Sequence, residues 1–312
     1  MNIFCHIPRE NWFCDRYGAE YSKHSKNNVS HTEINTDTDL IWLLAGWCWR
    51  QIDLNVLKSK KVICTIHHEV PEKFDNKRYE NFIARDKIVD AYHVPCKQTA
   101  NFISKLTDKP IHILSYWANN DIWLQKDRNE TKNKYGLPKD SFVVGSFQRD
   151  TEGHDLISPK LEKGPDRFCE YVEKLTKKET NVHVLLNGWR RQYVINRLKS
   201  KDIPFTYVEL PPIEIVSEMY SACDLYVVGS RWEGGPQAIL ECALTRTPIV
   251  STNVGIASNI LPSSCIIDMD KEYHTYIPSD KDVDFCFNSV QSFLLKDYVS
   301  LYDKLFLTIL EQ

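Results

Sequence analysis

One stretch decides the fold: Ser230-Arg231-Trp232-Glu233-Gly234-Gly235-Pro236-Gln237-Ala238-Ile239-Leu240-Glu241. It follows an apolar run at 225–228, and Pro236 opens an amphipathic segment behind it. Two adjacent glycines let a backbone approach a ligand without interference from a Cβ atom, and proline suits the first turn of a helix. The order of strand, glycine turn and helix start predicts an anion site at the carboxyl end of a parallel strand.

Around this stretch, the second half of the chain alternates short apolar runs with amphipathic segments. That alternation predicts repeated β-α units and a parallel sheet. Strands are expected at 142–147, 182–186, 205–208, 225–228 and 248–251. Helices are expected at 166–177, 190–200, 213–222 and 236–246.

The first half repeats the pattern more sparsely, with a closing helix expected at 298–310. Its strands are expected at 2–6, 40–44, 62–66, 91–94 and 111–114, and its helices at 15–23, 79–88 and 97–106. The polar, turn-rich stretch 126–140 is the predicted linker. The sequence therefore predicts two Rossmann-like domains, at 1–128 and 129–290, with 291–312 returning to the first.

Composition places the chain among ordinary globular proteins. Its 312 residues suffice for two domains, and 42% are hydrophobic and 26% charged. The 39 basic and 42 acidic side chains are well mixed and leave a net charge of -3. Nucleic acid is not expected as a partner, because such binding needs a basic patch or stripe.

The ten cysteines contain no Cys-x-x-Cys pair and are predicted to be reduced core thiols. The start of the sequence lacks the pattern of a signal peptide, and no apolar run reaches about 18 residues, so a cytoplasmic protein without a transmembrane segment is expected. The aromatic run Trp42 to Trp49 has two interpretations, a buried strand and a membrane-facing patch. Peripheral membrane contact therefore stays open.

Two glutamates with seven residues between them, Glu233 and Glu241, are followed by Thr247-Pro248-Ile249-Val250 and Asn253-Val254-Gly255. This order resembles glycosyltransferase family 4 and its GT-B relatives, which carry a Glu-x7-Glu motif before an apolar strand and a glycine turn. The resemblance extends over most of 135–262. It implies a GT-B fold, with two Rossmann-like domains facing each other across a cleft. It also implies a retaining, group 1 type hexosyltransferase that uses a nucleoside-diphosphate sugar and an unidentified glycan, lipid or small-molecule acceptor.

The family carries a basic pair that neutralises the donor diphosphate, which corresponds here to Arg149 and Lys163. A departing nucleoside diphosphate gains negative charge, so fixed cations and helix N-termini stabilise it when no metal is bound. Residues 150–162 are interpreted as an insertion between the two, and Gln148 stands where the family usually has glycine.

The resemblance also assigns the remaining donor contacts. Glu241 is expected to bind the ribose hydroxyls and Glu233 the hydroxyls of the transferred sugar. The other expected donor residues are Gly234, Gly235, Pro236 and Gln237 by backbone contact, Leu210 at the nucleobase and Arg190 as a second phosphate ligand.

In the first half, His67 resembles the family histidine that contacts the donor sugar. Read as metal ligands, His67, His68 and Glu69 would alternate between the two sides of a strand, which prevents joint coordination. The first loop, Ile7 to Asn11, lacks the paired glycines common among relatives.

No metal or other cofactor is expected. Asp37-Thr38-Asp39 precedes a strand and therefore lies at the amino edge of the sheet, away from the expected site. Asp268-Met269-Asp270 lies beyond the donor motif, where a turn is expected.

Two alternatives from other classes remain. A degenerate GT-B protein acting as a binding scaffold fits the departures in the first half, and an NDP-sugar epimerase-like enzyme would share the donor site. The combination of His67, Lys163, Glu233 and Glu241 favours the transferase.

Overall fold

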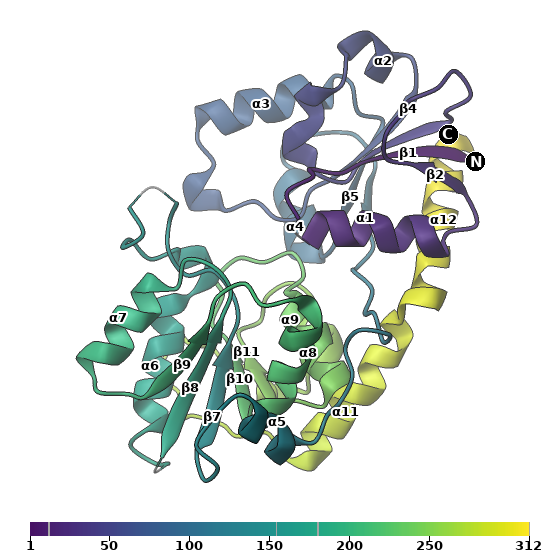
Figure 1. The fold of residues 1–312 in the computed structure, drawn as a ribbon. Helices are drawn as coiled ribbons and strands as arrows, with labels where there is room; N and C mark the ends of the chain where they lie inside the picture. Colours follow the sequence, from purple (N-terminus) through teal and green to yellow (C-terminus); the bar gives the residue numbers. More distant parts are fainter. Residues whose placement is uncertain (12, 154, 180, 312) are drawn as a thin grey trace. The chain divides into compact units, whose positions relative to one another are not determined.

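The computed structural model describes residues 1–11, 13–153, 155–179 and 181–311. The predicted domains include Trp12, His154, Thr180 and Gln312, which lie outside the described residues. The chain folds into two compact units (Figure 1). Unit 1 combines Met1–Trp117 with the segment from Ser292 onward, and unit 2 is Ala118–Gln291.

In the described part of unit 1, six strands form one sheet in the order β2-β1-β3-β4-β5-β6, and all pairings are parallel. The strands are β1 (Asn2–His6), β2 (Asn28–Ser30), β3 (Leu40–Leu43), β4 (Lys61–Thr65), β5 (Ala91–Val94) and β6 (Ile111–Ile113). The helices are α1 (Phe13–His24), α2 (Leu54–Lys58), α3 (Asn76–Asp86), α4 (Lys97–Ile103) and α12 (Leu295–Glu311), with short 3-10 turns η1 (Gly46–Gln51) and η2 (Pro71–Lys73). A further turn, η5 (Gln291–Phe293), leads into α12.

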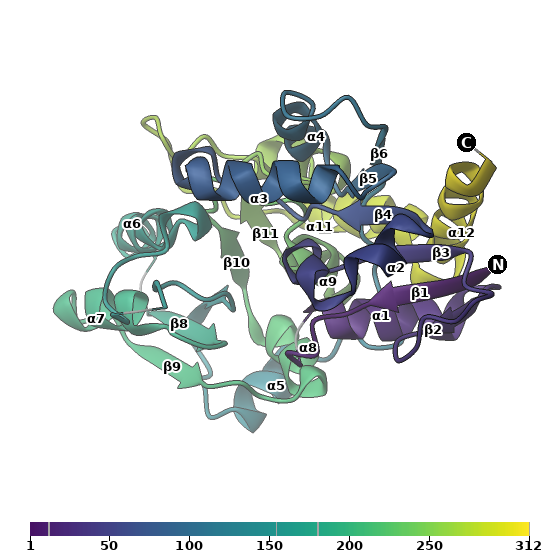
Figure 2. The same ribbon diagram turned by 90° about the horizontal axis from the view of Figure 1, so that it is seen from above.

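Right-handed crossovers on the two sides of β1 and β3 put α1 on one face of this sheet and α2 to α4 on the other. Helix α12 packs beside α1, as Figure 2 shows. Its Tyr302 and Phe306 are fully buried against Tyr21 and Trp42, whose rings lie 5.1 to 6.4 Å away between centroids. Aromatic side chains carry large buried areas, so α12 is an integral part of the core of unit 1.

In the described part of unit 2, a five-stranded parallel sheet has the order β11-β10-β7-β8-β9. Its strands are β7 (Phe142–Ser146), β8 (Val182–Asn187), β9 (Phe205–Val208), β10 (Leu225–Val228) and β11 (Ile249–Ser251). Its helices are α5 (Arg128–Lys134), α6 (Pro165–Leu175), α7 (Gln192–Ser200), α8 (Ile213–Ala222), α9 (Gln237–Thr245), α10 (Ala257–Ile260) and α11 (Asp280–Val290), with turns η3 (Leu161–Lys163) and η4 (Ser263–Cys265). Helices α6 and α7 cover one face and α8 and α9 the other (Figure 1).

Burial explains why these runs are strands. Every residue of β3, β8 and β10 is buried, as expected of parallel strands covered on both faces. The predicted α/β class with two Rossmann-like domains is confirmed. Strands 2–6, 91–94, 205–208 and 225–228 agree with their predictions at both ends.

The prediction of a linker at 126–140 is wrong, because this stretch folds as part of unit 2. Asp127 caps α5 by accepting a hydrogen bond from the Glu130 amide, and the helix packs on α8. Lys132 is buried, and its Nζ lies 2.6 Å from Asp224 Oδ2. The division therefore lies between Trp117 and Ala118 rather than at 128/129.

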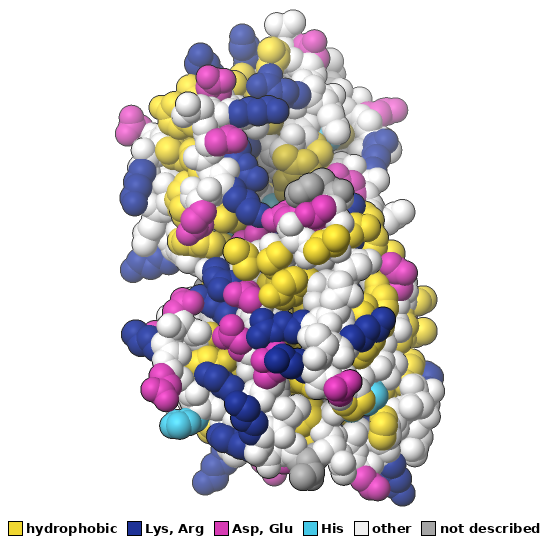
Figure 3. All heavy atoms as spheres, turned by 90° about the vertical axis from the view of Figure 1, so that its left-hand side faces the viewer, with side chains coloured by type: hydrophobic (Ala, Val, Ile, Leu, Met, Phe, Trp, Pro, Cys, Tyr) yellow, Lys and Arg dark blue, Asp and Glu magenta, His cyan; other side chains and the backbone are white. Residues whose placement is uncertain are grey.

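The surface and the thiols complete the description. All ten cysteines are buried and none forms a disulfide. Trp42 and Trp49 are buried whereas Trp47 is 48% exposed, so the aromatic run belongs mainly to the core. Figure 3 shows basic and acidic side chains interspersed on one face of the molecule. No described helix has the length and apolar character needed to cross a membrane.

Candidate functional site

The carboxyl edge of the sheet in unit 2 brings the predicted donor residues together. Strands β7, β8, β9 and β10 are parallel, so the segments that follow them all leave from the same edge. These segments carry Arg149, Arg190, Leu210 and the stretch from Ser230 to Glu241, respectively.

Lys163 and Glu233 form the central ion pair of this edge. Lys163 lies at the end of η3 and Glu233 in the loop after β10, and Nζ is 2.5 Å from Oε1. The Ser230 hydroxyl is 3.3 Å from the same carboxylate oxygen. Glu233 is 8% exposed, and a carboxylate this buried requires a close cation.

The loops that carry Lys163 and Glu233 are in close backbone contact with each other. Gly164 has φ +63°, and a Cβ there would lie 1.8 Å from the Gly229 carbonyl oxygen. Gln148 donates from Nε2 to the Lys163 carbonyl at 2.8 Å, and the Arg231 amide donates to the Glu162 carbonyl at 2.8 Å. Gln148 thus holds the Lys163 loop from the end of β7.

Helix α9 begins directly beyond this loop. Pro236 is its N-cap rather than its first helical residue, and Gln237 starts the helix. Gly255 has φ +55°, and a Cβ there would lie 2.7 Å from the Gly234 carbonyl oxygen, so the turn after β11 supports the Gly234-Gly235 loop. The first amides of a helix have no intrahelical partner and carry a positive dipole, which suits them to an anion.

Glu241 lies in the second turn of α9 and is 7% exposed. The Tyr220 hydroxyl of α8 donates to Glu241 Oε2 at 2.6 Å. Burial, and next the charge of Glu241, raise the pKa of Tyr220 well above its ordinary value, so the phenol remains a donor. Tyr220 could not be predicted from the sequence, because no motif marks a tyrosine near the end of the preceding helix.

Lys160 is a second residue of this edge that the sequence did not predict. Its Nζ lies 3.3 Å from Oε1 of the buried Glu162. Burial lowers the pKa of Lys160, and the charges of Arg149 and Lys163 lower it further. The supposed insertion therefore supplies a third cation close to the predicted basic pair.

Arg190 and Arg191 have different environments. Arg191 is fully buried, with Nε 2.9 Å from Asp150 Oδ2 and further hydrogen bonds to the carbonyl oxygens of Ser146 and Asn187. These two hydrogen bonds connect the carboxyl ends of β7 and β8. Arg190 instead stacks on Trp189, with its guanidinium carbon 3.8 Å from the ring centroid.

Leu210 follows β9, the edge strand of the sheet, and is 65% exposed. Its exposure leaves an apolar side chain accessible where the nucleobase was predicted to pack.

His67 follows β4 in unit 1. Nε2 lies 2.9 Å from the Leu44 carbonyl oxygen and must donate to it, so Nδ1 accepts from the Tyr116 hydroxyl at 2.5 Å. Burial lowers the pKa of His67 to about 4. The imidazole is neutral at neutral pH, and both of its nitrogens have partners within unit 1.

Within the described residues, no group of three or more His, Cys, Asp or Glu side chains is arranged to hold a metal ion. Asp268 lies 2.8 Å from Lys271, and Asp270 pairs with Arg167. Independence from metal stays a prediction.

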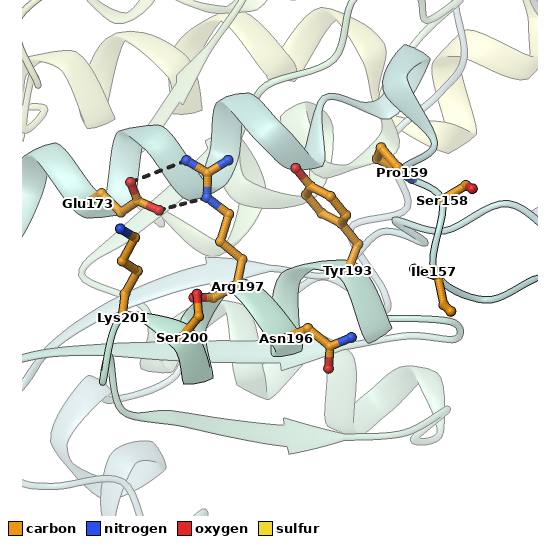
Figure 4. A pocket seen from close by; sticks show the side chains of 9 residues that line it. All are labelled: Ile157, Ser158, Pro159, Glu173, Tyr193, Asn196, Arg197, Ser200 and Lys201. Carbon is orange, nitrogen blue, oxygen red and sulfur yellow. Dashed lines mark hydrogen bonds and ion pairs between the residues drawn. The ribbon is translucent and has the colours of Figure 1, made fainter.

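A surface pocket of about 720 Å³ lies elsewhere in unit 2 (Figure 4). An ion pair between Arg197 and Glu173, 2.7 Å long, forms part of its wall. Its lining residues are Ile157, Ser158, Pro159, Glu173, Tyr193, Asn196, Arg197, Ser200 and Lys201. None of the predicted site residues is among them, so this pocket is separate from the donor motif.

Residues 156–272 match the family model described as "Glycosyl transferases group 1". This part of unit 2 is similar to group 1 glycosyltransferases. The match contains Lys160, Lys163, Glu233 and Glu241 and ends before α11.

A curated relative gives a similar result. The chain is 20% identical over 220 residues to the O-antigen biosynthesis glycosyltransferase WclY of Escherichia coli. The alignment covers 66% of this chain and 58% of WclY, so the chain spans less than two thirds of the length of that relative.

Solved structures of similar fold include Anabaena Alr3699/HepE in complex with UDP and glucose. It has a TM-score of 0.76 and 11% identity, with 98% of this chain and 99% of that chain covered. A glycosyltransferase from Rickettsia africae has a TM-score of 0.68 and 14% identity over 100% and 99% of the two chains. Sucrose-phosphate synthase from Thermosynechococcus elongatus has a TM-score of 0.65 and 16% identity over 97% and 81%. These likenesses show the predicted GT-B fold.

Proposed function

We propose that the chain is a retaining glycosyltransferase of the family 4 type, with a nucleoside-diphosphate sugar as donor and unit 2 as the donor-binding unit. The Lys163–Glu233 ion pair carries the proposal, because it joins the loop before α6 to the glycine loop that opens α9. A nucleotide scaffold without transfer activity has no need for a buried carboxylate paired with a lysine at this position.

The donor we favour carries UDP. HepE was crystallised with UDP and glucose, with UDP and with UDP-glucose, and its fold matches nearly the whole of this chain. A glycan acceptor is favoured, because WclY is a glycosyltransferase of O-antigen biosynthesis. Cytoplasmic location, with or without peripheral membrane contact, belongs to the same proposal.

In the proposed reaction the bond between the anomeric carbon and the phosphate oxygen breaks, and a bond to the acceptor oxygen forms on the same face. The leaving phosphate takes the acceptor proton. Arg149, Lys163 and the N-terminus of α9 stabilise the charge that develops on the diphosphate, without a metal. Positioning and charge stabilisation are thus the enzyme's contribution.

Each carboxylate has a proposed partner on the donor. When the diphosphate draws Lys163 away, Glu233 is released to accept hydrogen bonds from the hydroxyls of the sugar. Glu241, oriented by Tyr220, accepts from the ribose hydroxyls. To contact the sugar, His67 has to exchange the Leu44 carbonyl for a hydroxyl oxygen, and as a neutral donor at Nε2 it is suited to do so.

The test is a transfer assay with radiolabelled UDP-glucose and other nucleotide sugars, with candidate glycans, lipids and small molecules as acceptors. We expect a labelled product with the anomeric configuration of the donor, formed equally well in excess EDTA. Inversion of the configuration contradicts the retaining mechanism. Loss of activity in EDTA that Mn²⁺ or Mg²⁺ restores contradicts the charge-stabilising role of Lys163 and Arg149.

The same assay separates the alternatives. A scaffold protein binds nucleotide but releases no labelled sugar from the donor under any condition. An epimerase-like enzyme converts the donor itself when no acceptor is present.

A further inference from the structure

The described residues of the segment 150–162, which leave out His154, form a loop that is closed at its base rather than a loose insertion. Thr151 and Pro159 form an antiparallel bridge, and the Glu152 amide donates to the Ser158 carbonyl at 2.9 Å. The Lys160 amide donates to the Asp150 carbonyl at 2.8 Å. The base of the loop is thereby closed directly beside Arg149.

The loop is anchored at both of its ends. At the start, the Asp150 carboxylate is held by the fully buried Arg191. At the end, the Lys163 amide donates to the Lys160 carbonyl at 2.8 Å, and the Gly164 that follows is pressed against Gly229. The outer residues Ile157, Ser158 and Pro159 border the pocket beside α7 (Figure 4).

The closed loop brings positively charged side chains close together. The side chain of Lys160 is only 17% exposed, and the backbone of Lys160 is hydrogen-bonded to Asp150, which adjoins Arg149, and to Lys163. After burial, the charges of Arg149 and Lys163 lower the pKa of Lys160. Two buried carboxylates offset them in part, Glu162 at 3.3 Å from Lys160 and Glu233 at 2.5 Å from Lys163. Like charges this close disfavour one another's charged form, and a bound anion would relieve the repulsion that the two carboxylates leave.

We infer that Lys160 is a third cation for the donor diphosphate, and that the closed loop 150–162 is the element that delivers it. The inference rests on the proposed function and extends it, because neither the family motif nor the predicted basic pair includes Lys160. With three cations, the site selects a diphosphate over a monophosphate, since the second phosphate adds charge and acceptor oxygens. Lys160 is therefore a residue that determines specificity for the leaving group.

The experiment is calorimetric titration of the full chain with UDP and with UMP, in low and moderate salt, for the parent, Lys160→Met and Lys160→Arg. We expect Lys160→Met to weaken UDP binding roughly tenfold or more, as for loss of a hydrogen bond to a charged group. UMP binding should change by less than about threefold, and the salt dependence of UDP binding should become shallower. Lys160→Arg should retain most of the affinity because it keeps the charge.

Lys178→Met is the matched control, because Lys178 is exposed beyond the end of α6. It should leave both titrations unchanged. Thermal unfolding without nucleotide checks that Lys160→Met folds like the parent.

Any of three outcomes would overturn the inference. The first is that Lys160→Met binds UDP as tightly as the parent, and the second is that it loses affinity for UDP and for UMP equally. The third is that the control Lys178→Met loses as much affinity for UDP as Lys160→Met does. If Lys163→Met loses affinity for UDP while Lys160→Met does not, the proposed donor site is supported and only the role of Lys160 is contradicted. If the parent binds none of UDP, ADP, GDP and dTDP, the proposed function falls as well.

Discussion

Tyr220 and Glu241 form a pair of buried polar groups whose geometry one hydroxyl controls. The phenol of Tyr220 donates to Glu241 Oε2 at 2.6 Å and so fixes the position of this carboxylate oxygen. In the low-dielectric interior such a hydrogen bond is strong, so the phenol helps to orient the carboxylate. Tyr220 is therefore a positioning residue for the proposed ribose contact.

We predict that Glu241→Gln weakens UDP binding by about 1 to 3 kcal/mol, the range for hydrogen bonds to a charged group. Tyr220→Phe should weaken it by a smaller amount, about 0.5 to 1.5 kcal/mol, because it removes one neutral donor and keeps the carboxylate. Isothermal titration with UDP measures both.

Tyr135→Phe is the control for the loss of a hydroxyl. Tyr135 also donates to a carboxylate of unit 2, at 2.5 Å from Glu218, but its partner lies on α8 and outside the donor motif. Equal losses in Tyr135→Phe and Tyr220→Phe exclude a specific role for Tyr220. A Glu241→Gln variant with parent affinity excludes the ribose contact.

At the scale of the element, Gly164 joins η3 to α6 and fixes where Lys163 points. We predict that Gly164→Ala abolishes measurable UDP binding and destabilises unit 2, because the new Cβ would lie 1.8 Å from the backbone oxygen of Gly229. Backbone atoms cannot rotate away as a flexible side chain can. Nucleotide titration and urea unfolding are the measurements.

Gly136→Ala provides a closely matched control. Gly136 has φ +64°, nearly the φ of Gly164, yet no heavy atom beyond Gly136 itself and its two chain neighbours lies within 4 Å of the position that a Cβ would take. It should cost only the left-handed strain, about 1 to 2 kcal/mol, with UDP binding intact. If the two variants behave alike, backbone strain rather than the contact with Gly229 is responsible.

The sequence predicted strands better than it predicted connections. Strands such as Leu225–Val228 are continuous apolar runs, which buried parallel strands require. Helix α5 was missed because its sequence, RNETKNK, has no apolar face, and its burial comes from the contacts of Lys132 with Ser141 and Asp224. β2, Asn28–Ser30, was missed because it is short and polar, and pairing with β1 defines it.

The same contrast holds for the site. Gly234, Gly235 and the two motif glutamates are local in sequence, so their place in the loop after β10 and in α9 could be predicted, whereas their roles at the donor stay predictions. Lys160 could not, because its proximity to Arg149 depends on the closure of the loop between Thr151 and Pro159. Tyr220 reaches Glu241 only because α8 and α9 pack together on one face of the sheet.

At the scale of the whole molecule, α12 is joined to unit 1 by aromatic rings. The Tyr302 hydroxyl donates to the Ser115 carbonyl at 2.9 Å and accepts from the Tyr17 hydroxyl at 3.0 Å. We predict that Tyr302→Ala lowers the free energy of unfolding of unit 1 by about 3 to 5 kcal/mol, the range for removing a large buried ring. Urea denaturation measures the change.

Leu301→Ala is the control from the adjacent position of α12. Leu301 is 38% exposed, so its removal should cost about 0.5 kcal/mol or less. Comparable losses in the two variants contradict a role for the packed face of α12 and indicate a general effect on the helix.

We predict that the stability of unit 1 falls as the pH is lowered, because unit 1 contains buried histidines. His93 is fully buried, its Nε2 lies 2.8 Å from the Leu114 carbonyl, and burial lowers its pKa to about 3. The unfolded chain takes up this proton below about pH 6.5 whereas the folded chain does not. The contribution of His93 to stability is therefore present above about pH 6.5 and is lost progressively as the pH falls towards 3, at up to roughly 1.4 kcal/mol per pH unit.

Urea denaturation at several pH values between 7.5 and 5 measures this slope. His93→Gln should flatten it, whereas replacement of the exposed His274 by glutamine should leave it as in the parent. A slope that is the same in all three proteins contradicts the assignment.

The discontinuous sequence of unit 1 has a consequence for vectorial synthesis. The ribosome makes Met1–Trp117 before unit 2, but the surface of Tyr17, Tyr21 and Trp42 that receives α12 cannot be covered until Leu295–Glu311 emerges. Unit 2 is continuous, so it can bury its core while unit 1 still exposes this aromatic surface. The usual order, in which the N-terminal domain folds first, should therefore be reversed, and nascent chains stalled before α12 should bind chaperones through unit 1.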